Sequence, residues 1–164
     1  MTSLGSKERI LVVGKGMVGH HFVEQLHQAN ENAQITVLCG ESRLAYDRVH
    51  LSSYFSGASA EDLALTDAAT YTEWGVNFVT NAMVTDILRD EKKVLTSEGQ
   101  AYVYDKLILA TGSYPFVPPI PGNNQPHCLV YRTIDDLEAI EASARESKTG
   151  VVVGGGLLGL EAAN

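Results

Sequence analysis

The feature that most restricts the fold of this sequence is a glycine pattern, G-x-G-x-x-G, that occurs twice. The first copy consists of Gly14, Gly16 and Gly19, and the second of Gly154, Gly156 and Gly159. Each copy directly follows a short apolar run, residues 9–13 or 151–153, which predicts a buried strand. A strand that leads through such glycines into a helix is typical of a dinucleotide-binding βαβ unit. The wide separation of the copies favours two such domains in series over a short solenoid repeat.

The residues after the first glycine pattern complete a βαβ unit. A helix is predicted by apolar residues at helical spacing, namely Val18, Phe22, Leu26 and Ala29. Residues 35–38 predict a second, parallel strand, and Glu41 follows just past its end. An acidic side chain at this place binds the ribose hydroxyls of a dinucleotide. We therefore expect a dinucleotide site here, and the alternative is a glycine turn used only for packing.

The glycine pattern suits a pyrophosphate for physical reasons. A helix N-terminus offers unpaired N–H groups and a partial positive charge. The first glycine permits the tight turn, the second lets the phosphate approach the backbone, and the third allows close packing of helix and strand. The residues between the second and third glycines open the two helices; they are Met17, Val18, Leu157 and Leu158. The sequence ends before a second strand or an acidic partner for the second copy, whose prediction rests on the pattern alone.

The remaining elements predict an α/β fold. Residues 76–80 predict a third parallel strand, and alternating residues predict an antiparallel meander over 82–89, 94–97 and 101–104. A further apolar run, 107–109, ends in Ala110-Thr111-Gly112. Thr133 opens a helix with Asp136 at the capping-box position. The fold expected is a Rossmann-like domain with a parallel sheet and a small antiparallel meander, followed by the start of a second Rossmann-like domain.

The expected domain boundaries follow from these elements. The first domain covers residues 8–114, a proline-rich extended connection covers 115–131, and the second domain begins at 132 and continues to 164. The 164 residues stop inside a predicted helix, so we expect them to be a truncated part of a longer protein.

Composition excludes several classes of function. Twenty acidic and twelve basic residues give a formal charge of −8, which disfavours nucleic acid and an anionic membrane as partners. No apolar run is long enough for a transmembrane helix, and we expect a cytoplasmic protein. The two cysteines, Cys39 and Cys128, form neither a disulfide framework nor a zinc motif. His20 and His21 are adjacent and face different directions, so we expect no metal site. We also expect no catalytic side chain, which suits chemistry carried by a cofactor.

Three further stretches resemble a known family. They are Tyr-Asp-Lys-Leu-Ile-Leu-Ala-Thr-Gly-Ser-Tyr-Pro from Tyr104, Ala-Tyr-Asp-Arg-Val-His-Leu-Ser-Ser-Tyr-Phe from Ala45, and Val-Tyr-Arg-Thr-Ile-Asp-Asp-Leu from Val130. Together with the glycine patterns, they resemble the pyridine nucleotide-disulfide oxidoreductase superfamily of FAD proteins. Within it, the chain is similar to the N-terminus of the large subunits of NAD(P)H-dependent nitrite reductases.

This resemblance implies cofactors and site residues. It implies FAD at the first site and NADH or NADPH at the second. It also implies that the FAD site includes Arg48, main chain at Val84, and the strand end Ala110, Thr111 and Gly112, and that Glu161 is the acidic residue that follows the second glycine pattern. Two charged contacts of many relatives are replaced here by Ser53 and Phe116.

For the intact protein, the resemblance implies hydride transfer from NAD(P)H to FAD. Electrons would continue through a 4Fe–4S iron–sulfur cluster and siroheme, held by later cysteines that these residues lack, and would reduce nitrite to ammonium. A small subunit of nitrite reductase is an implied partner. Two alternatives stay open: an NADH-dependent reductase of rubredoxin or ferredoxin, and a non-catalytic adenine-nucleotide-binding module.

Overall fold

The structure is a computed structural model that describes residues 7–30 and 32–163. Asn164, the last residue of the expected second domain, lies outside the described residues. The chain divides into two compact units, Met1–Asp47 with Ala64–Gly112, and Arg48–Leu63 with Ser113–Asn164. Among the helices in the described ranges, none combines the length and the hydrophobicity needed to cross a bilayer.

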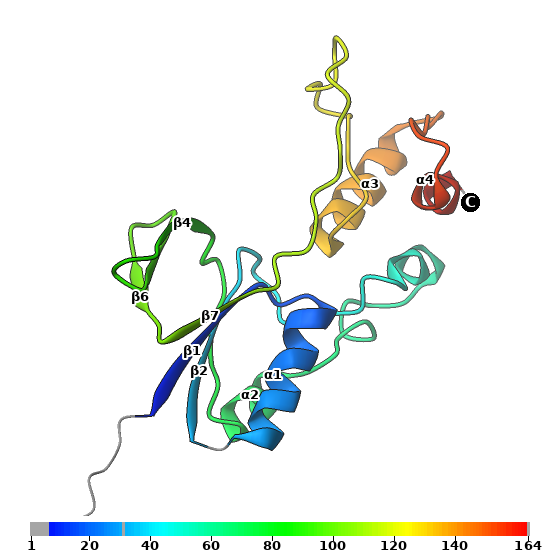
Figure 1. The fold of residues 1–164 in the computed structure, drawn as a ribbon. Helices are drawn as coiled ribbons and strands as arrows, with labels where there is room; N and C mark the ends of the chain where they lie inside the picture. The colour runs from blue at the N-terminus through cyan, green and yellow to red at the C-terminus, as the bar shows by residue number, and fades with distance from the viewer. Residues whose placement is uncertain (1–6, 31, 164) are drawn as a thin grey trace, which may run out of the picture. The chain divides into compact units, whose positions relative to one another are not determined.

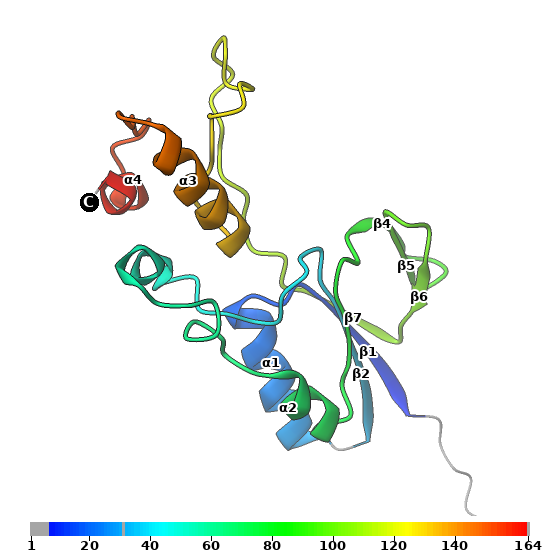
Figure 2. The same ribbon diagram turned by 180° about the vertical axis from the view of Figure 1, so that it is seen from behind.

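The first unit is built on a parallel sheet (Figures 1 and 2). Its four strands have the order β3-β2-β1-β7. They are β1 (Glu8–Val13), β2 (Ala33–Leu38), β3 (Asn77–Val79) and β7 (Lys106–Leu109), with helices α1 (Met17–Ala29) and α2 (Ala68–Glu73). Ile10 of β1 pairs with Ile35 of β2 on one side and with Lys106 of β7 on the other. The sheet confirms the predicted βαβ unit and its parallel third strand.

A second, three-stranded sheet forms the predicted meander. Its antiparallel strands have the order β4-β5-β6 and are β4 (Val84–Leu88), β5 (Lys93–Thr96) and β6 (Ala101–Val103). The turn between β4 and β5 contains Lys92, whose φ is positive at 48°. Both sheets together confirm the expected fold class of a parallel sheet with a small antiparallel meander.

The two faces of the parallel sheet carry different hydrophobic clusters, because alternate residues of a strand point to opposite faces. Val12 and Val37 pack on one face with Val23 of α1 and Tyr71 of α2. The other face, which carries Leu11 and Leu38, packs against meander residues such as Val94. Figures 1 and 2 accordingly show α1 and α2 on one side of β1 and β2, and the meander on the other.

In the described part of the second unit, the structure shows a 3₁₀ helix and two α-helices. They are η1 (Leu51–Ser56), α3 (Ile134–Glu146) and α4 (Leu157–Ala163). The predicted capping box of α3 is present: Thr133 Oγ1 accepts from Asp136 N at 3.2 Å, and Asp136 Oδ2 accepts from Thr133 N at 2.8 Å. Residues 113–120 contain no helix and no strand.

The prediction of a strand at residues 151–153 is wrong. Val151, Val152 and Val153 do not form a strand and are exposed. A strand is stabilised by hydrogen bonds to a neighbouring strand, and no strand in the described residues pairs with this segment. An apolar, β-branched run has the propensity to form a strand, but a strand also requires a neighbouring strand with which to form hydrogen bonds.

Candidate functional site

The first glycine turn connects β1 to α1. Gly14 N donates to the carbonyl oxygen of Leu38 at 2.9 Å, which ties the turn to the end of β2. The φ of Gly14 is +105°, a conformation that glycine adopts without steric cost. A Cβ atom at this position would overlap the carbonyl oxygen of Ala110. Gly14 is therefore required both by its backbone conformation and by close packing.

The other two glycines of the turn differ in how closely they are packed: Gly19 is tightly packed and Gly16 is not. A Cβ atom on Gly19 would overlap the carbonyl oxygen of Gly14, so that α1 approaches the turn closely only with glycine there. Around Gly16, in contrast, nothing lies within 4 Å of the position that a Cβ atom would occupy. The structure thus keeps space open at the second glycine, where the sequence predicts that a phosphate approaches the backbone.

The N-terminus of α1 offers donors at this open space. Gly16 is the N-cap and has no side chain that could accept from the first turn, and the first turn contains no acidic residue. The N–H groups of the first helical residues have no acceptor within the helix. Met17 and Val18 stand in this turn with exposed side chains. The open space, the donors and the helix dipole together fit a pyrophosphate.

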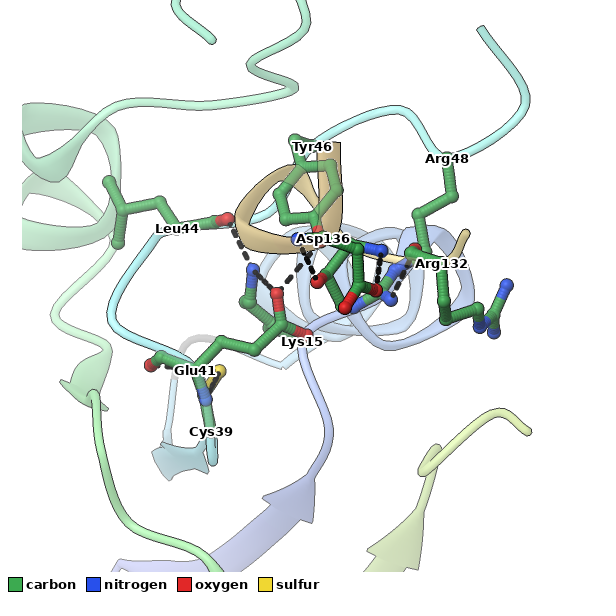
Figure 3. Close-up of polar contacts among 9 residues, drawn as sticks. Lys15, Cys39, Glu41, Leu44, Tyr46, Arg48, Arg132 and Asp136 are labelled. Carbon is green, nitrogen blue, oxygen red and sulfur yellow. Dashed lines mark hydrogen bonds and ion pairs between the residues drawn. The ribbon is translucent and has the colours of Figure 1, made fainter. Parts of the chain in front are cut away.

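Glu41 follows β2, on a segment that is fixed by several contacts (Figure 3). Lys15 Nζ lies 3.1 Å from Glu41 Oε2, and Tyr46 Oη donates to the same oxygen at 2.8 Å. Glu41 N donates to Cys39 Sγ at 3.2 Å. Sequence reasoning identified Glu41 but missed Lys15 and Tyr46, because no periodicity connects the stretch after β2 to the glycine turn.

The start of the meander lies beside Glu41. Ala82 N donates to Cys39 O at 2.7 Å, and Asn81 N donates to Glu41 O at 3.1 Å. Val84 begins β4 two residues later and is partly buried. The structure therefore brings the main chain before Val84 next to the end of β2.

The strand end 110–112 meets the glycine turn. Ala110 N donates to Val13 O at 2.8 Å, and Thr111 N lies 3.1 Å from the position of a Cβ atom on Gly14. Gly112 has a positive φ of 70°. Five parts of the predicted first site thus belong to one unit: the glycine turn, Glu41, Val84, Ala110 and Thr111-Gly112.

The second glycine pattern, in the other unit, shares several features with the first, although nothing lies within 4 Å of the place of a Cβ atom on Gly154. Gly154 has a φ of +134°, and a Cβ atom on Gly159 would overlap the carbonyl oxygen of Gly154. Around Gly156 nothing lies within 4 Å of the place of a Cβ atom. Leu160 N donates to Gly156 O at 3.0 Å, as His20 N donates to Gly16 O at 2.9 Å. Leu157 and Leu158, which open α4, have exposed side chains.

Glu161 of α4 contacts an aromatic residue that the sequence reasoning missed. Tyr131 Oη donates to Glu161 Oε1 at 3.1 Å, and the Tyr131 ring stacks on Phe55 with 6.5 Å between centroids. Burial, followed by the hydrogen bond to the Glu161 carboxylate, raises the pKa of Tyr131 to about 12. Tyr131 therefore stays a phenol, and a hydrogen-bond donor, at neutral pH.

Arg48 belongs to this second unit. One guanidinium nitrogen, Nη1, donates to the carbonyl oxygen of Arg132 at 3.4 Å, and Arg132 Nε donates to Ser113 O at 3.2 Å. Phe116, one of the two departures from the family pattern, is strongly exposed, and Ser53 Oγ, the other, donates to His50 O at 2.7 Å. Arg132 is a cationic side chain that sequence reasoning did not single out.

Within the part of the chain that the structure describes, no three His, Cys, Asp or Glu side chains are grouped so as to hold a metal ion. Cys39 is buried and Cys128 is exposed, and the two belong to different units. Cys39 is packed in the interior as a small residue, and its sulfur accepts the hydrogen bond from Glu41 N.

Comparison with known proteins identifies the family of the chain. Residues 8–164 match the family described as pyridine nucleotide-disulphide oxidoreductase. The chain is 54% identical over 160 residues to the nitrite reductase (NADH) large subunit of Escherichia coli (strain K12), covering 96% of this chain and 19% of that protein.

Solved structures share the fold. A water-forming NADH oxidase from Lactobacillus brevis, bound to NADH, matches with a TM-score of 0.87 and 26% identity over 95% of this chain and 36% of its own. An NADH:rubredoxin oxidoreductase from Clostridium acetobutylicum matches with a TM-score of 0.83 and 25% identity, over 93% of this chain and 40% of its own. The chain belongs to the pyridine nucleotide-disulphide oxidoreductase family.

Proposed function

We propose that the first unit binds FAD. The N-terminus of α1 and the open space at Gly16 receive the pyrophosphate, and Glu41 accepts hydrogen bonds from the adenosine ribose. The strand end Ala110-Thr111-Gly112 and the main chain at Val84 complete the site, and Arg48 supplies a cationic donor. The support is the family membership together with the space that Gly16 leaves within a turn otherwise closely packed.

We propose NADH or NADPH as the ligand of the second glycine pattern. Its turn shares these features with the first, and the Lactobacillus brevis relative is bound to NADH. In this assignment residues 8–114 are the FAD-binding domain, 115–131 the connection and 132–164 the beginning of the NAD(P)-binding domain. NAD(P)H is a cytoplasmic reductant, so we assign the protein to the cytoplasm.

The intact protein, in this proposal, is the large subunit of an NAD(P)H-dependent nitrite reductase that acts with a small subunit. The observation that carries it is the 54% identity, over 96% of this chain, to a nitrite reductase large subunit. This chain would hold FAD and NAD(P)H, and the bound FAD would supply hydride acceptance and single-electron transfer toward a 4Fe–4S cluster and siroheme elsewhere in the protein, for the reduction of nitrite to ammonium. The residues of this chain bind and orient the two nucleotides, and none acts as an acid or a base.

A second candidate is a reductase of rubredoxin or ferredoxin. It is favoured by the likeness to the NADH:rubredoxin oxidoreductase structure. The reading frame after Asn164 separates the two candidates, because clustered cysteines are required only for the nitrite reductase.

The test uses the intact purified protein under anaerobic conditions. NAD(P)H is expected to bleach the flavin absorbance, and nitrite is expected to restore it. Bleaching that is reversed by oxidised rubredoxin and not by nitrite would favour the carrier reductase. A protein that binds ADP but retains no flavin would be a non-catalytic nucleotide-binding module.

A further inference from the structure

Lys15 stands between two glycines of the first turn and is almost completely buried. Its side chain is 2% exposed, whereas that of its ion-pair partner Glu41 is 26% exposed. A buried ammonium group requires compensating contacts, because its removal from water is costly. The ion pair of Lys106 with Glu8 in the same unit is different: the two side chains are 62% and 40% exposed, although their charged atoms are also close, at 3.0 Å.

The contacts of Lys15 connect three segments of the first unit (Figure 3). Its ammonium donates to Leu44 O at 2.9 Å, lies 3.1 Å from Glu41 Oε2 and lies 4.1 Å from the centroid of the Tyr46 ring. The turn before α1, the end of β2 and the stretch 44–46 therefore meet at one side chain. A cation over an aromatic face gains additional stabilisation when it is desolvated.

Tyr46 contacts the same carboxylate oxygen as Lys15. It is 2% exposed, and its hydroxyl donates to Glu41 Oε2 at 2.8 Å. A bridge between Tyr46 and Ala64, and the hydrogen bond from Leu65 N to Ala45 O at 3.0 Å, fix its backbone. The Glu41 carboxylate thus meets two buried donors from one side, while its side chain still reaches solvent.

We propose that Lys15 is a positioning residue that, with Tyr46, holds the Glu41 carboxylate oriented to accept hydrogen bonds from the vicinal hydroxyls of the adenosine ribose. This inference rests on the proposed FAD site. The ammonium also offsets the charge that Glu41 would otherwise present to the diphosphate of the same ligand. Recognition of the ribose diol therefore depends on Lys15, a buried side chain that contacts Glu41.

The experiment compares two ligands that differ only in the ribose. Apoprotein of the intact chain is titrated with FAD and with an FAD analogue that lacks the 2′ and 3′ hydroxyls of its adenosine, and flavin fluorescence follows binding. The flavin signal excludes ligand bound at the second nucleotide site. The measured quantity is the ratio of the two dissociation constants, which a general loss of stability would not change.

Wild-type protein is expected to prefer FAD about tenfold or more, as charge-assisted hydrogen bonds imply. Lys15→Met is expected to reduce this ratio to near unity, as is Glu41→Gln. The double variant Lys15→Met/Glu41→Gln is expected to match the single variants, because both changes remove one interaction. Lys106→Met, which removes the exposed pair with Glu8, serves as the matched control and leaves the ratio unchanged.

Tyr46→Phe provides a second variant in case Lys15→Met does not fold. It keeps the ring under the ammonium and removes one donor to Glu41, so its ratio is expected to lie between those of wild type and Glu41→Gln. The comparison uses Lys15→Met or Tyr46→Phe, whichever variant folds. If that variant keeps the wild-type ratio of dissociation constants and still binds FAD, the proposed role of Lys15 and Tyr46 is overturned. Failure of wild-type apoprotein to bind FAD would instead overturn the proposed function.

Discussion

Gly19 lies so close to the carbonyl oxygen of Gly14 that no Cβ atom fits between them. This contact sets the distance between α1 and the turn after β1. We expect Gly19→Ala to push the helix away and to lower the free energy of unfolding by about 1–3 kcal/mol, as overpacking does. Fluorescence of Trp74, the single tryptophan, reports unfolding of this unit in urea. An unchanged unfolding midpoint would contradict the close packing.

Gly16→Ala, in contrast to Gly19→Ala, is expected to weaken FAD binding more than it weakens the fold. Gly16 has a φ of −56° and open space at the Cβ position, so alanine fits the fold. We expect the free energy of unfolding to fall by no more than about 1 kcal/mol, the cost of alanine at an N-cap. FAD affinity of the intact protein is expected to fall about tenfold, because the methyl group separates phosphate from backbone at a site where close approach is required. Undiminished affinity would show that the phosphate does not use this space.

The strands and turns of the first unit could be predicted from the sequence because their signals are local. Apolar runs at 9–13 and 35–38, and a glycine pattern between them, determine a βαβ unit wherever the second strand can pair with the first. Val151–Val153 shows the limit of this reasoning. The same kind of run forms no strand, since pairing is not a property of the run itself.

The candidate site could be predicted only in part. Gly14, Gly16, Gly19 and Glu41 follow from a spacing with a known physical purpose. The contact of Lys15 with Tyr46 could not be predicted, because it depends on how the aperiodic stretch after β2 folds back on the glycine turn. The hydrogen bond from Arg132 to Ser113 could not be predicted for a related reason, since it joins segments without a shared pattern.

Asp105 is expected to make stability depend on pH in the acidic range. Arg9 donates to it from the guanidinium Nη2 at 2.8 Å and from the backbone N at 2.8 Å. These hydrogen bonds hold the pKa of Asp105 well below its ordinary value. The stabilisation is therefore complete above the unfolded-state pKa of about 4 and is lost as pH falls below it.

Asp105→Asn tests this dependence. The variant is expected to be less stable than wild type at pH 7, and the difference is expected to shrink below about pH 4. Urea unfolding followed by Trp74 fluorescence at several pH values measures it. Asp90→Asn, in the exposed turn between β4 and β5, is the control. A difference that is independent of pH would contradict the assignment to Asp105.

The capping box of α3 is expected to stabilise the second unit. Thr133→Ala removes the acceptor for Asp136 N and is expected to cost about 1 kcal/mol. Hydrogen exchange of the amides in the first turns of α3 measures the effect locally. Thr133→Ser keeps the hydroxyl and is expected to retain wild-type protection, and equal protection in the alanine variant would contradict the role of the cap.

His20 is expected to make the contact between α1 and α2 sensitive to mild acid. Its Nδ1 lies 2.9 Å from Tyr71 Oη, and its ring stacks on Trp74 with 6.2 Å between centroids. Burial lowers the pKa of His20, opposed by the charge of Glu24 and assisted by that of His21. The unfolded chain therefore binds a proton more readily, and stability is complete above the ordinary histidine pKa of about 6.5 and declines as pH falls through it.

His20→Gln is expected to flatten this decline. Wild-type protein should lose stability between about pH 6.5 and pH 5, and the variant should lose less over the same range. Urea unfolding read from Trp74 fluorescence at both pH values measures the change. His21→Gln is the matched control, because His21 is the exposed neighbour on the same helix and pairs with Glu24 at 3.2 Å. An equal decline in wild type and His20→Gln would show that another group titrates, such as His27, whose ring also stacks on Trp74 with 5.3 Å between centroids.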